Sequence, residues 1–201
     1  MNPNSQFPAE WDEAMSKCPA IFIDRDGVII HNQPNYVRSL RQVKIYPRAI
    51  QAIALAAASS YRIVMVTNQA GIGKGLYSLE TVNAIHHEIL RAVEQAGGRI
   101  DGIYICPHKN EDGCNCRKPK PGLLNQAAHD LKIDLANSFM VGDAISDMQA
   151  GQQAGVKQAI LVLTGRGLAQ KKLALASGAA AAIFVRKSLY EAIVYILGLS
   201  K

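Results

Sequence analysis

Two aspartates separated by one residue follow a short apolar run near the N-terminus. Asp24 and Asp26 lie in the segment DRDG, directly after AIFI, and Gly27 permits a tight exit from it. A hard cation such as Mg²⁺ prefers carboxylate and carbonyl oxygens and keeps water ligands that a phosphate can replace. Asp24 could then attack phosphorus as a nucleophile, while Asp26 could serve as the general acid and base. An Asp-x-Asp pair after a strand is about equally typical of a solvated turn or a helix cap.

Other polar groups along the chain favour the chemical interpretation. Thr67 ends a second apolar run before the glycine-rich AGIGKG, where hydroxyl, amide and backbone N–H groups can hold phosphoryl oxygens. Lys118 offers a point charge and Arg117 a bidentate fork, two kinds of cation that bind phosphate. Asp143 in GDAISD is a third carboxylate for a metal, and Asp147 behind it can support the site. Because several such groups occur at predicted strand ends or in the following loops, a solvated turn or a helix cap is the weaker explanation of the two aspartates.

A short polar segment, CPHKNEDGCNC, holds three of the four cysteines and one histidine. Its spacing is C-x-H-x5-C-x-C, formed by Cys106, His108, Cys114 and Cys116. These are ligands that Zn²⁺ takes in closed tetrahedral sites, which leave no position for water, so we predict a structural ion that orders the loop. The alternative is buried free thiols with a surface histidine. Because Arg117 and Lys118 directly follow the last ligand, we expect the zinc to hold these cations near the phosphate.

Strand-like and helix-like segments alternate along the chain and must position these groups. The apolar runs that predict strands cover residues 20–24, 61–68, 99–106, 137–143, 157–163 and 181–185. Helices are predicted from Pro47, from Ser78 as N-cap to Gly97, from about Gly122, over 145–154 and after the last strand. This rhythm predicts an α/β fold with a doubly wound parallel sheet, in which ligands bind outside the carboxyl ends of the strands.

Length and composition fit one globular domain, which we place over residues 20–201 after a polar N-terminal extension over 1–19. The 201 residues are 49% apolar. The first nineteen contain no apolar run of signal-peptide length, and no window approaches the roughly 18 apolar residues of a membrane span. We therefore expect a cytoplasmic protein with reduced thiols and no membrane contact. The net charge of +6 would suit a polyanion, but the cations are scattered apart from Arg117, Lys118 and Lys120, and aromatics are only 6%. A small anionic ligand explains the charge equally well, and we expect no nucleic-acid partner.

The ordered motifs DRDG, VTN, the lysine of RKPKPG and GDAISD resemble the haloacid dehalogenase-like phosphatase superfamily over residues 20–165. Within it, DRDG, TNQAGIGKG, CPH, CNCRKPKPG and DMQAG are similar to the D-glycero-D-manno-heptose bisphosphate phosphatases. The histidinol-phosphate phosphatases share the zinc loop and CRKP. NQAGI at 68–72, Gly75 and NYV at 35–37 favour the heptose branch. The resemblance implies a Rossmann-like, haloacid dehalogenase-like domain and, as for small phosphatases of this type, a monomer. The short segments between motifs leave no room for a large cap domain.

The resemblance also implies a role for each matching residue. Asp24 would be the nucleophile and Asp26 the general acid/base, while Thr67 and Lys118 would stabilise the transferring phosphoryl group. Mg²⁺ would be held by the Asp24 side chain, the Asp26 main-chain carbonyl and Asp143. Substrate contacts are implied for Arg25, Asn35, Tyr36, Asn68, Gln69, Ala70 and Arg117. Ala144 departs from the pattern, because relatives often carry a basic residue at this position that contacts the substrate. The departure affects how the distal phosphate is bound.

The predicted function is Mg²⁺-dependent hydrolysis of the C7 phosphate of D-glycero-D-manno-heptose 1,7-bisphosphate. The resemblance implies an aspartyl-phosphate intermediate and heptose 1-phosphate as the product for nucleotide-activated heptose biosynthesis. Histidinol phosphate or a broader set of phosphosugars is the alternative substrate, and an acidic pocket for an ammonium group would favour histidinol phosphate. A phosphatase of nucleic-acid 3′ ends would need further modules, and a non-catalytic scaffold would not need Asp24, Asp26, Lys118 and Asp143.

Overall fold

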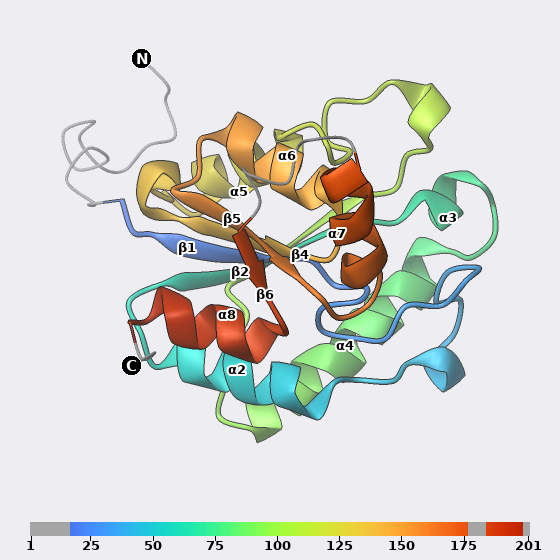
Figure 1. The fold of residues 1–201 in the computed structure, drawn as a ribbon. Coiled ribbons are helices and arrows are strands. Elements are labelled where there is room, and N and C mark those ends of the chain that lie inside the picture. Colours follow the sequence, from blue (N-terminus) through green and yellow to red (C-terminus); the bar gives the residue numbers. More distant parts are fainter. Residues whose placement is uncertain (1–16, 177–183, 199–201) are drawn as a thin grey trace, which may run out of the picture.

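Six parallel strands form the centre of the molecule (Figure 1), in the spatial order β3-β2-β1-β4-β5-β6. The computed structural model describes residues 17–176 and 184–198. The strands are β1 (Ala20–Ile23), β2 (Arg62–Asn68), β3 (Gly102–Cys106), β4 (Phe139–Gly142), β5 (Gln158–Val162) and β6 (Phe184–Arg186). The chain moves outward from β1 through β2 to β3 and then crosses to β4 on the other side of β1. The topological switch point therefore lies between β1 and β4, and the predicted doubly wound parallel sheet is confirmed.

Helices cover both faces of this sheet (Figure 1). They are α2 (Pro47–Ala57), α3 (Ala70–Gly73), α4 (Leu79–Gln95), α5 (Gly122–Asp130), α6 (Ile145–Ala154), α7 (Gly167–Ala176) and α8 (Leu189–Ile196). Within the described ranges, the short 3₁₀ helices are η1 (Leu40–Gln42), η2 (Asn110–Asp112) and η3 (Leu135–Asn137). Buried side chains of α2, α4 and α8 pack on one face, and those of α5 and α6 on the other. In the described residues, the loop after β1 and the cysteine loop carry only η1 and η2, so neither forms a large cap.

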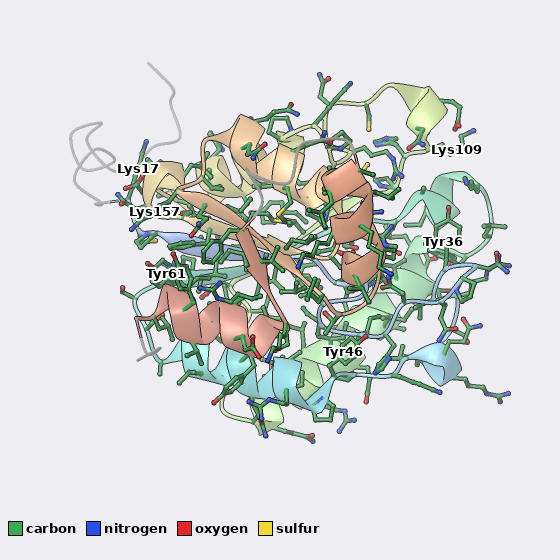
Figure 2. The ribbon with its side chains drawn as sticks, viewed as in Figure 1. Lys17, Tyr36, Tyr46, Tyr61, Lys109 and Lys157 are labelled. Carbon is green, nitrogen blue, oxygen red and sulfur yellow. The ribbon has the colours of Figure 1, made fainter. Side chains whose placement is uncertain are left out.

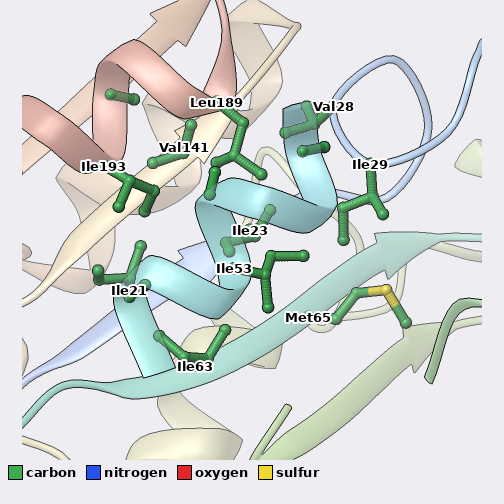
Figure 3. Close-up of a cluster of buried hydrophobic side chains, with 14 of the residues drawn as sticks. Ile21, Ile23, Val28, Ile29, Ile53, Ile63, Met65, Val141, Leu189 and Ile193 are labelled. Atoms are coloured by element: carbon green, nitrogen blue, oxygen red, sulfur yellow. The ribbon is translucent and has the colours of Figure 1, made fainter. Parts of the chain in front are cut away.

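The alternation of side chains along β1 builds two separate cores. Ile21 and Ile23 point into the core under α2 and α8 (Figure 3), whereas Ala20 and Phe22 point into the core under α5 and α6. All four side chains are fully buried, and burial of a large aliphatic or aromatic side chain contributes about 1.5–3 kcal/mol. This central strand is thus fixed from both faces, which holds the residue after it, Asp24, in place.

Local sequence signals set the helix ends where they were predicted. Pro47 is the first residue of α2, and the Ser78 hydroxyl caps α4 by accepting the Thr81 N–H at 3.3 Å. Gly97, with φ of +75°, follows the end of that helix. The glycine-rich segment after β2 contains a short helix, α3, because the Lys74 N–H bonds to the Ala70 carbonyl and closes one helical turn.

Both chain ends adjoin segments outside the described residues. Residues 1–16 of the predicted N-terminal extension lie outside them, while the Cys18 backbone pairs with Lys132 and Asp134. The last predicted strand begins in 181–183, also outside the described residues, and β6 covers its remainder. Within 17–176 and 184–198, no helix has the length and apolar character needed to cross a membrane.

Candidate active site and metal centres

A cavity of about 760 Å³ opens at the carboxyl ends of the central strands. Its walls come from the end of β1 and the following loop, the end of β2, the cysteine loop, the start of α6 and the segment after β5. Tyr36, in the loop after β1, and Lys109, in the cysteine loop, lie on the same side of the molecule (Figure 2). The site therefore forms where a parallel sheet is expected to bind its ligand.

Asp24 is the first residue past β1 and forms an ion pair with Lys118. The Lys118 ammonium donates to Asp24 Oδ1 at 2.7 Å and to the Val66 carbonyl at 2.9 Å, and it lies 2.7 Å from Asp147 Oδ1. Burial raises the pKa of Asp24 to about 7 against the opposing charge of Lys118. Burial also acts against the Lys118 cation, but Asp147 and Asp24 outweigh it and raise its pKa. Lys118 therefore stays protonated beside the carboxylate.

Asp26 faces the cavity and is held by two buried side chains, Arg25 and Gln69. Arg25, only 1% exposed, donates to both carboxylate oxygens at 2.9–3.1 Å. Gln69 donates from Nε2 to Asp26 Oδ2 at 3.0 Å. The other end of the Arg25 fork lies 3.2 Å from His86 Nε2, which must be the acceptor because arginine only donates. Arg25 thus orients Asp26 here, and its predicted substrate contact stays a prediction.

Residues at the end of β2 organise the site from behind. Asn68 bonds to the Lys118 backbone twice, accepting the N–H at 3.1 Å and donating to the carbonyl at 2.9 Å. Gln69 donates to Thr67 Oγ1 at 2.8 Å and accepts from the Tyr77 hydroxyl at 2.9 Å. Asn68 and Gln69 line the cavity, whereas Thr67 is fully buried. Their predicted contacts with a ligand stay predictions, but both amides fix catalytic candidates in place.

Asp143, the residue after β4, has both carboxylate oxygens occupied by donors. Asn32 Nδ2 and the Arg166 backbone N–H each donate to Oδ2 at 2.8 Å, and Arg166 NH2 donates to Oδ1 at 2.9 Å. Gly27 passes so close that a Cβ atom on it would lie 2.0 Å from Asp143 Oδ2. The tight exit predicted for this glycine therefore has a specific cause, the approach of a carboxylate from the neighbouring strand.

The donor set at the switch point suits a hard divalent cation. Carboxylate oxygens of Asp24, Asp143 and Asp147 all lie within 4.8 Å of one another, and oxygen ligands are those that Mg²⁺ prefers. Asn32 Oδ1, beside Asp143, is buried without a hydrogen-bond partner among the described residues and is a further oxygen at this place. The side chains of Asp24 and Asp143 meet as predicted, while the ligand role of the Asp26 carbonyl remains a prediction.

The cysteine loop gathers its four candidate ligands into one cluster. Cys116 Sγ lies 3.3 Å from Cys106 Sγ and 3.5 Å from Cys114 Sγ, and His108 Nδ1 is 3.2 Å from Cys116 Sγ. A tetrahedron with Zn–S bonds of about 2.3 Å has edges of about 3.8 Å, so the cluster is near the size that zinc requires. Burial opposes ionisation of Cys114, but backbone hydrogen bonds led by that of Arg117 lower its pKa to about 7. The fit supports a closed zinc site.

Arg117 is tied to the same loop. Its Nε donates to Asn110 Oδ1 at 2.5 Å, and its NH1 lies 3.4 Å from the His108 carbonyl. These contacts aim Arg117 along the cavity wall, which its side chain lines together with Lys118. Loop geometry and cation position are thus coupled, as the adjacency in the sequence suggested.

The remaining predicted contacts differ in where they lie. Tyr36 and Ala70 line the cavity, but Asn35 is exposed and is not among the described residues that line it. Tyr36 has φ of +66°, a conformation uncommon outside glycine and often found at functional sites.

Sequence reasoning did not single out Asn32 or Arg166. Asp143 was selected because it follows a predicted strand. Arg166 lies shortly after β5, so the same criterion, a polar residue just past the end of a strand, could have identified it.

The sequence is similar to a family of hydrolases and to phosphatases of known name. The model of the HAD-hydrolase-like family matches residues 115–192. A D-glycero-beta-D-manno-heptose-1,7-bisphosphate 7-phosphatase of Bordetella bronchiseptica is 42% identical over 147 residues, which cover 73% of this chain and 82% of that protein. The enzyme of the same name from Vibrio cholerae is 40% identical, with 79% and 89% covered.

A solved structure supports the same relationship. The crystal structure of D,D-heptose 1,7-bisphosphate phosphatase from B. bronchiseptica, complexed with magnesium and phosphate, superposes with a TM-score of 0.83. It is 37% identical, and the alignment covers 90% of this chain and 99% of that one. The corresponding phosphatase from Burkholderia thailandensis gives a TM-score of 0.66 at 33% identity, with 91% and 99% covered.

Proposed function

The chain belongs to the D-glycero-beta-D-manno-heptose-1,7-bisphosphate 7-phosphatase family of HAD-like hydrolases, and we propose that it removes the C7 phosphate of that bisphosphate. The observation that carries the proposal is the pairing of two differently placed aspartates at one cavity. Asp24 is buried against Lys118, whereas Asp26 is more exposed and turned to the cavity. One carboxylate is thus placed to attack phosphorus and the other to exchange a proton with the leaving group.

The proposed reaction has two steps. An oxygen of Asp24 forms a bond to phosphorus while the bond from phosphorus to O7 breaks, and Asp26 gives its proton to O7. Asp26 then takes a proton from a water, whose oxygen attacks phosphorus and releases Asp24 and inorganic phosphate. Lys118, held by Asp24, Asp147 and the Val66 carbonyl, stays charged and offsets the negative phosphoryl oxygens. Heptose 1-phosphate is the other product, available for nucleotide activation.

Mg²⁺, when bound by Asp24, Asp143 and the Asp26 carbonyl, would neutralise phosphoryl charge and screen the approach of an anion to a carboxylate. The protein's own part is to keep the ligands in position. Asn32 and the Arg166 backbone hold Asp143, and Arg25 with Gln69 holds Asp26. Magnesium and phosphate are present in the related Bordetella structure, which supports the same cofactor here.

The charges on the cavity wall favour a second phosphate over an ammonium group. Arg117 lines the wall, as does Arg166, whose guanidinium pairs with Asp143. The carboxylates among the described residues of the wall are Asp24, Asp26 and Asp147. All three of these acids are already bound to Lys118 or Arg25. Histidinol phosphate needs an acidic partner for its ammonium group, whereas a bisphosphate needs a cation beyond the reacting phosphate. The heptose bisphosphate is therefore the better match, and the beta anomer is the one that the related enzymes are named for.

We propose a structural role for zinc in the cysteine loop. Cys106, His108, Cys114 and Cys116 would fill all four positions and leave none for water. A polar loop with few apolar side chains gains its order from such an ion. Because Arg117 bonds to Asn110 and His108 of this loop, the ordered loop fixes the position of the cation that meets the substrate.

The test follows the phosphorus atoms of the beta bisphosphate by ³¹P NMR in the presence of MgCl₂. We expect the C7 phosphomonoester signal to disappear and the C1 glycosyl phosphate signal to persist. Asp24→Asn, which keeps the side-chain volume, should show no turnover and an unchanged circular dichroism spectrum. Loss of the C1 signal, or appreciable turnover by the folded variant, would overturn the proposed site or the role of Asp24.

A further inference from the structure

The Asp143 carboxylate has a donor arrangement that bears on metal binding. Three hydrogen bonds end on Oδ2, from Asn32 Nδ2, the Arg166 backbone N–H and, at 3.4 Å, Arg166 Nε. Oδ1 accepts from Arg166 NH2 at 2.9 Å. A cation bound through Oδ1 would meet the hydrogen of that NH2 group, and the guanidinium itself carries like charge. Metal and guanidinium therefore compete for the same oxygen.

The Arg166 side chain is free to leave without loss of the carboxylate's orientation. It is 57% exposed, in contrast to Asp143, which is fully buried. If the guanidinium rotates away, Asn32 and the Arg166 backbone N–H still hold Oδ2. The anchoring contacts thus come from fixed groups, and the contact to Oδ1 comes from a group that can move.

A displaced guanidinium would remain in the cavity. Arg166 lines the same cavity as Arg117, Lys118 and Asp24. Lys118 is buried between Asp24 and Asp147, and Arg25 is buried against Asp26 and His86, so neither has a side chain turned to solvent. Arg166, once released from Asp143, offers a planar fork of the kind that binds a phosphate through two N–H groups.

We propose that Arg166 is exchanged between two anions, binding Asp143 before a divalent cation does and binding the distal, C1 phosphate of the substrate once the cation holds Asp143. Metal binding thereby releases the Arg166 guanidinium to bind the substrate. The identity of the second anion rests on the proposed function, whereas the competition at Asp143 does not. The chain has Ala144 next to Asp143, and its methyl group cannot supply this contact.

The test measures Mg²⁺ affinity by calorimetric titration without substrate, for the wild type, Arg166→Gln and Lys172→Gln. Lys172 is an exposed lysine of α7 that does not line the cavity, so its substitution removes the same charge at a distance. We expect Arg166→Gln to tighten Mg²⁺ binding about threefold to fivefold, the value of one partly exposed ion pair. Lys172→Gln should shift it much less. Unchanged or weaker binding by Arg166→Gln would show that Arg166 is a fixed support of Asp143 and would overturn the competition.

A second arm uses Arg166→Lys and two substrates. Lysine keeps the charge but has no planar fork, so Mg²⁺ affinity should fall between those of the wild type and Arg166→Gln. The KM for the 1,7-bisphosphate should rise about tenfold in Arg166→Gln, while the KM for heptose 7-phosphate, which lacks the distal phosphate, should stay near that of the wild type. Equal changes for both substrates would refute the contact with the distal phosphate. If the wild type hydrolyses neither compound, the proposed function fails, and the metal titration still decides the competition.

Discussion

Replacing Gly27 with alanine, in comparison with the same change at Gly155, separates two reasons for a glycine. One is its backbone conformation, and the other is its close approach to Asp143, a candidate metal ligand. Gly27 has φ of +83°, and a Cβ atom there would lie 2.0 Å from Asp143 Oδ2 and 2.7 Å from Asn32 Oδ1. Gly155, which ends α6, has φ of +78°, and a Cβ on it would have no neighbour within 4 Å. The two substitutions share the same conformational cost and differ in the steric one.

The magnitudes follow from these two geometries. An alanine in the left-handed region costs about 1–2 kcal/mol, and Gly155→Ala should lose that much stability and nothing else. Gly27→Ala adds an overlap with a fixed, buried carboxylate, for which overpacking typically costs about 1–3 kcal/mol more. The expected total loss for Gly27→Ala is therefore about 2–5 kcal/mol. Because the overlap is with Asp143 itself, the carboxylate must shift.

Urea denaturation and a Mg²⁺ titration together test this expectation. Gly155→Ala should bind Mg²⁺ and turn over substrate as the wild type does. Gly27→Ala should be less stable than Gly155→Ala, bind Mg²⁺ more weakly and lose at least about tenfold in kcat/KM, equivalent to about 1.4 kcal/mol. Equal stability of the two variants, with wild-type Mg²⁺ affinity in Gly27→Ala, would refute the proposed packing of Gly27 on a metal ligand.

Two further predictions concern the cysteine loop and the buried histidine, His86. Cys114→Ser should lower bound zinc, measured by atomic absorption, and raise KM more than it lowers kcat, because the loop positions Arg117; full activity without zinc would contradict that role. Burial and Arg25 lower the pKa of His86 from 6.5 to about 3, so the folded state keeps it neutral, and stability should fall by up to about 1.4 kcal/mol per pH unit as pH drops below 6.5. In His86→Gln the amide oxygen can still accept from Arg25. The free energy of unfolding of this variant, measured by urea denaturation between pH 7 and pH 4, should depend less steeply on pH than that of the wild type. An identical pH dependence would show that His86 does not titrate on unfolding.

The fold and the positions of the acidic groups were predictable because they depend on local patterns. Apolar runs of strand length fixed the sheet, and the residue after a parallel strand faces the ligand edge. Asp24 and Asp143 follow β1 and β4, and these strands are neighbours, so their carboxylates meet. The capping of α4 by Ser78 is equally local.

Other features depend on contacts between distant segments and have no local signal. Asn68 holds the Lys118 backbone across 50 residues, and Arg166 reaches Asp143 across 23. His86 lies on the face of α4 that meets Arg25, and helical spacing alone does not identify that partner. Which polar partner a buried side chain finds is decided by how the helices and loops pack, and the sequence pattern does not encode that choice in any one place.

The most direct measurement of function is kcat/KM, with saturating MgCl₂, for D-glycero-beta-D-manno-heptose 1,7-bisphosphate, its alpha anomer and histidinol phosphate at matched concentrations. A bisphosphate-binding cavity with Arg117 and Arg166 on its wall predicts a strong preference for the heptose bisphosphate, and kinship with the named relatives predicts the beta anomer. A preference for histidinol phosphate, or equal values for all three compounds, would contradict the proposed substrate and leave Asp24 and Lys118 serving a different phosphate ester.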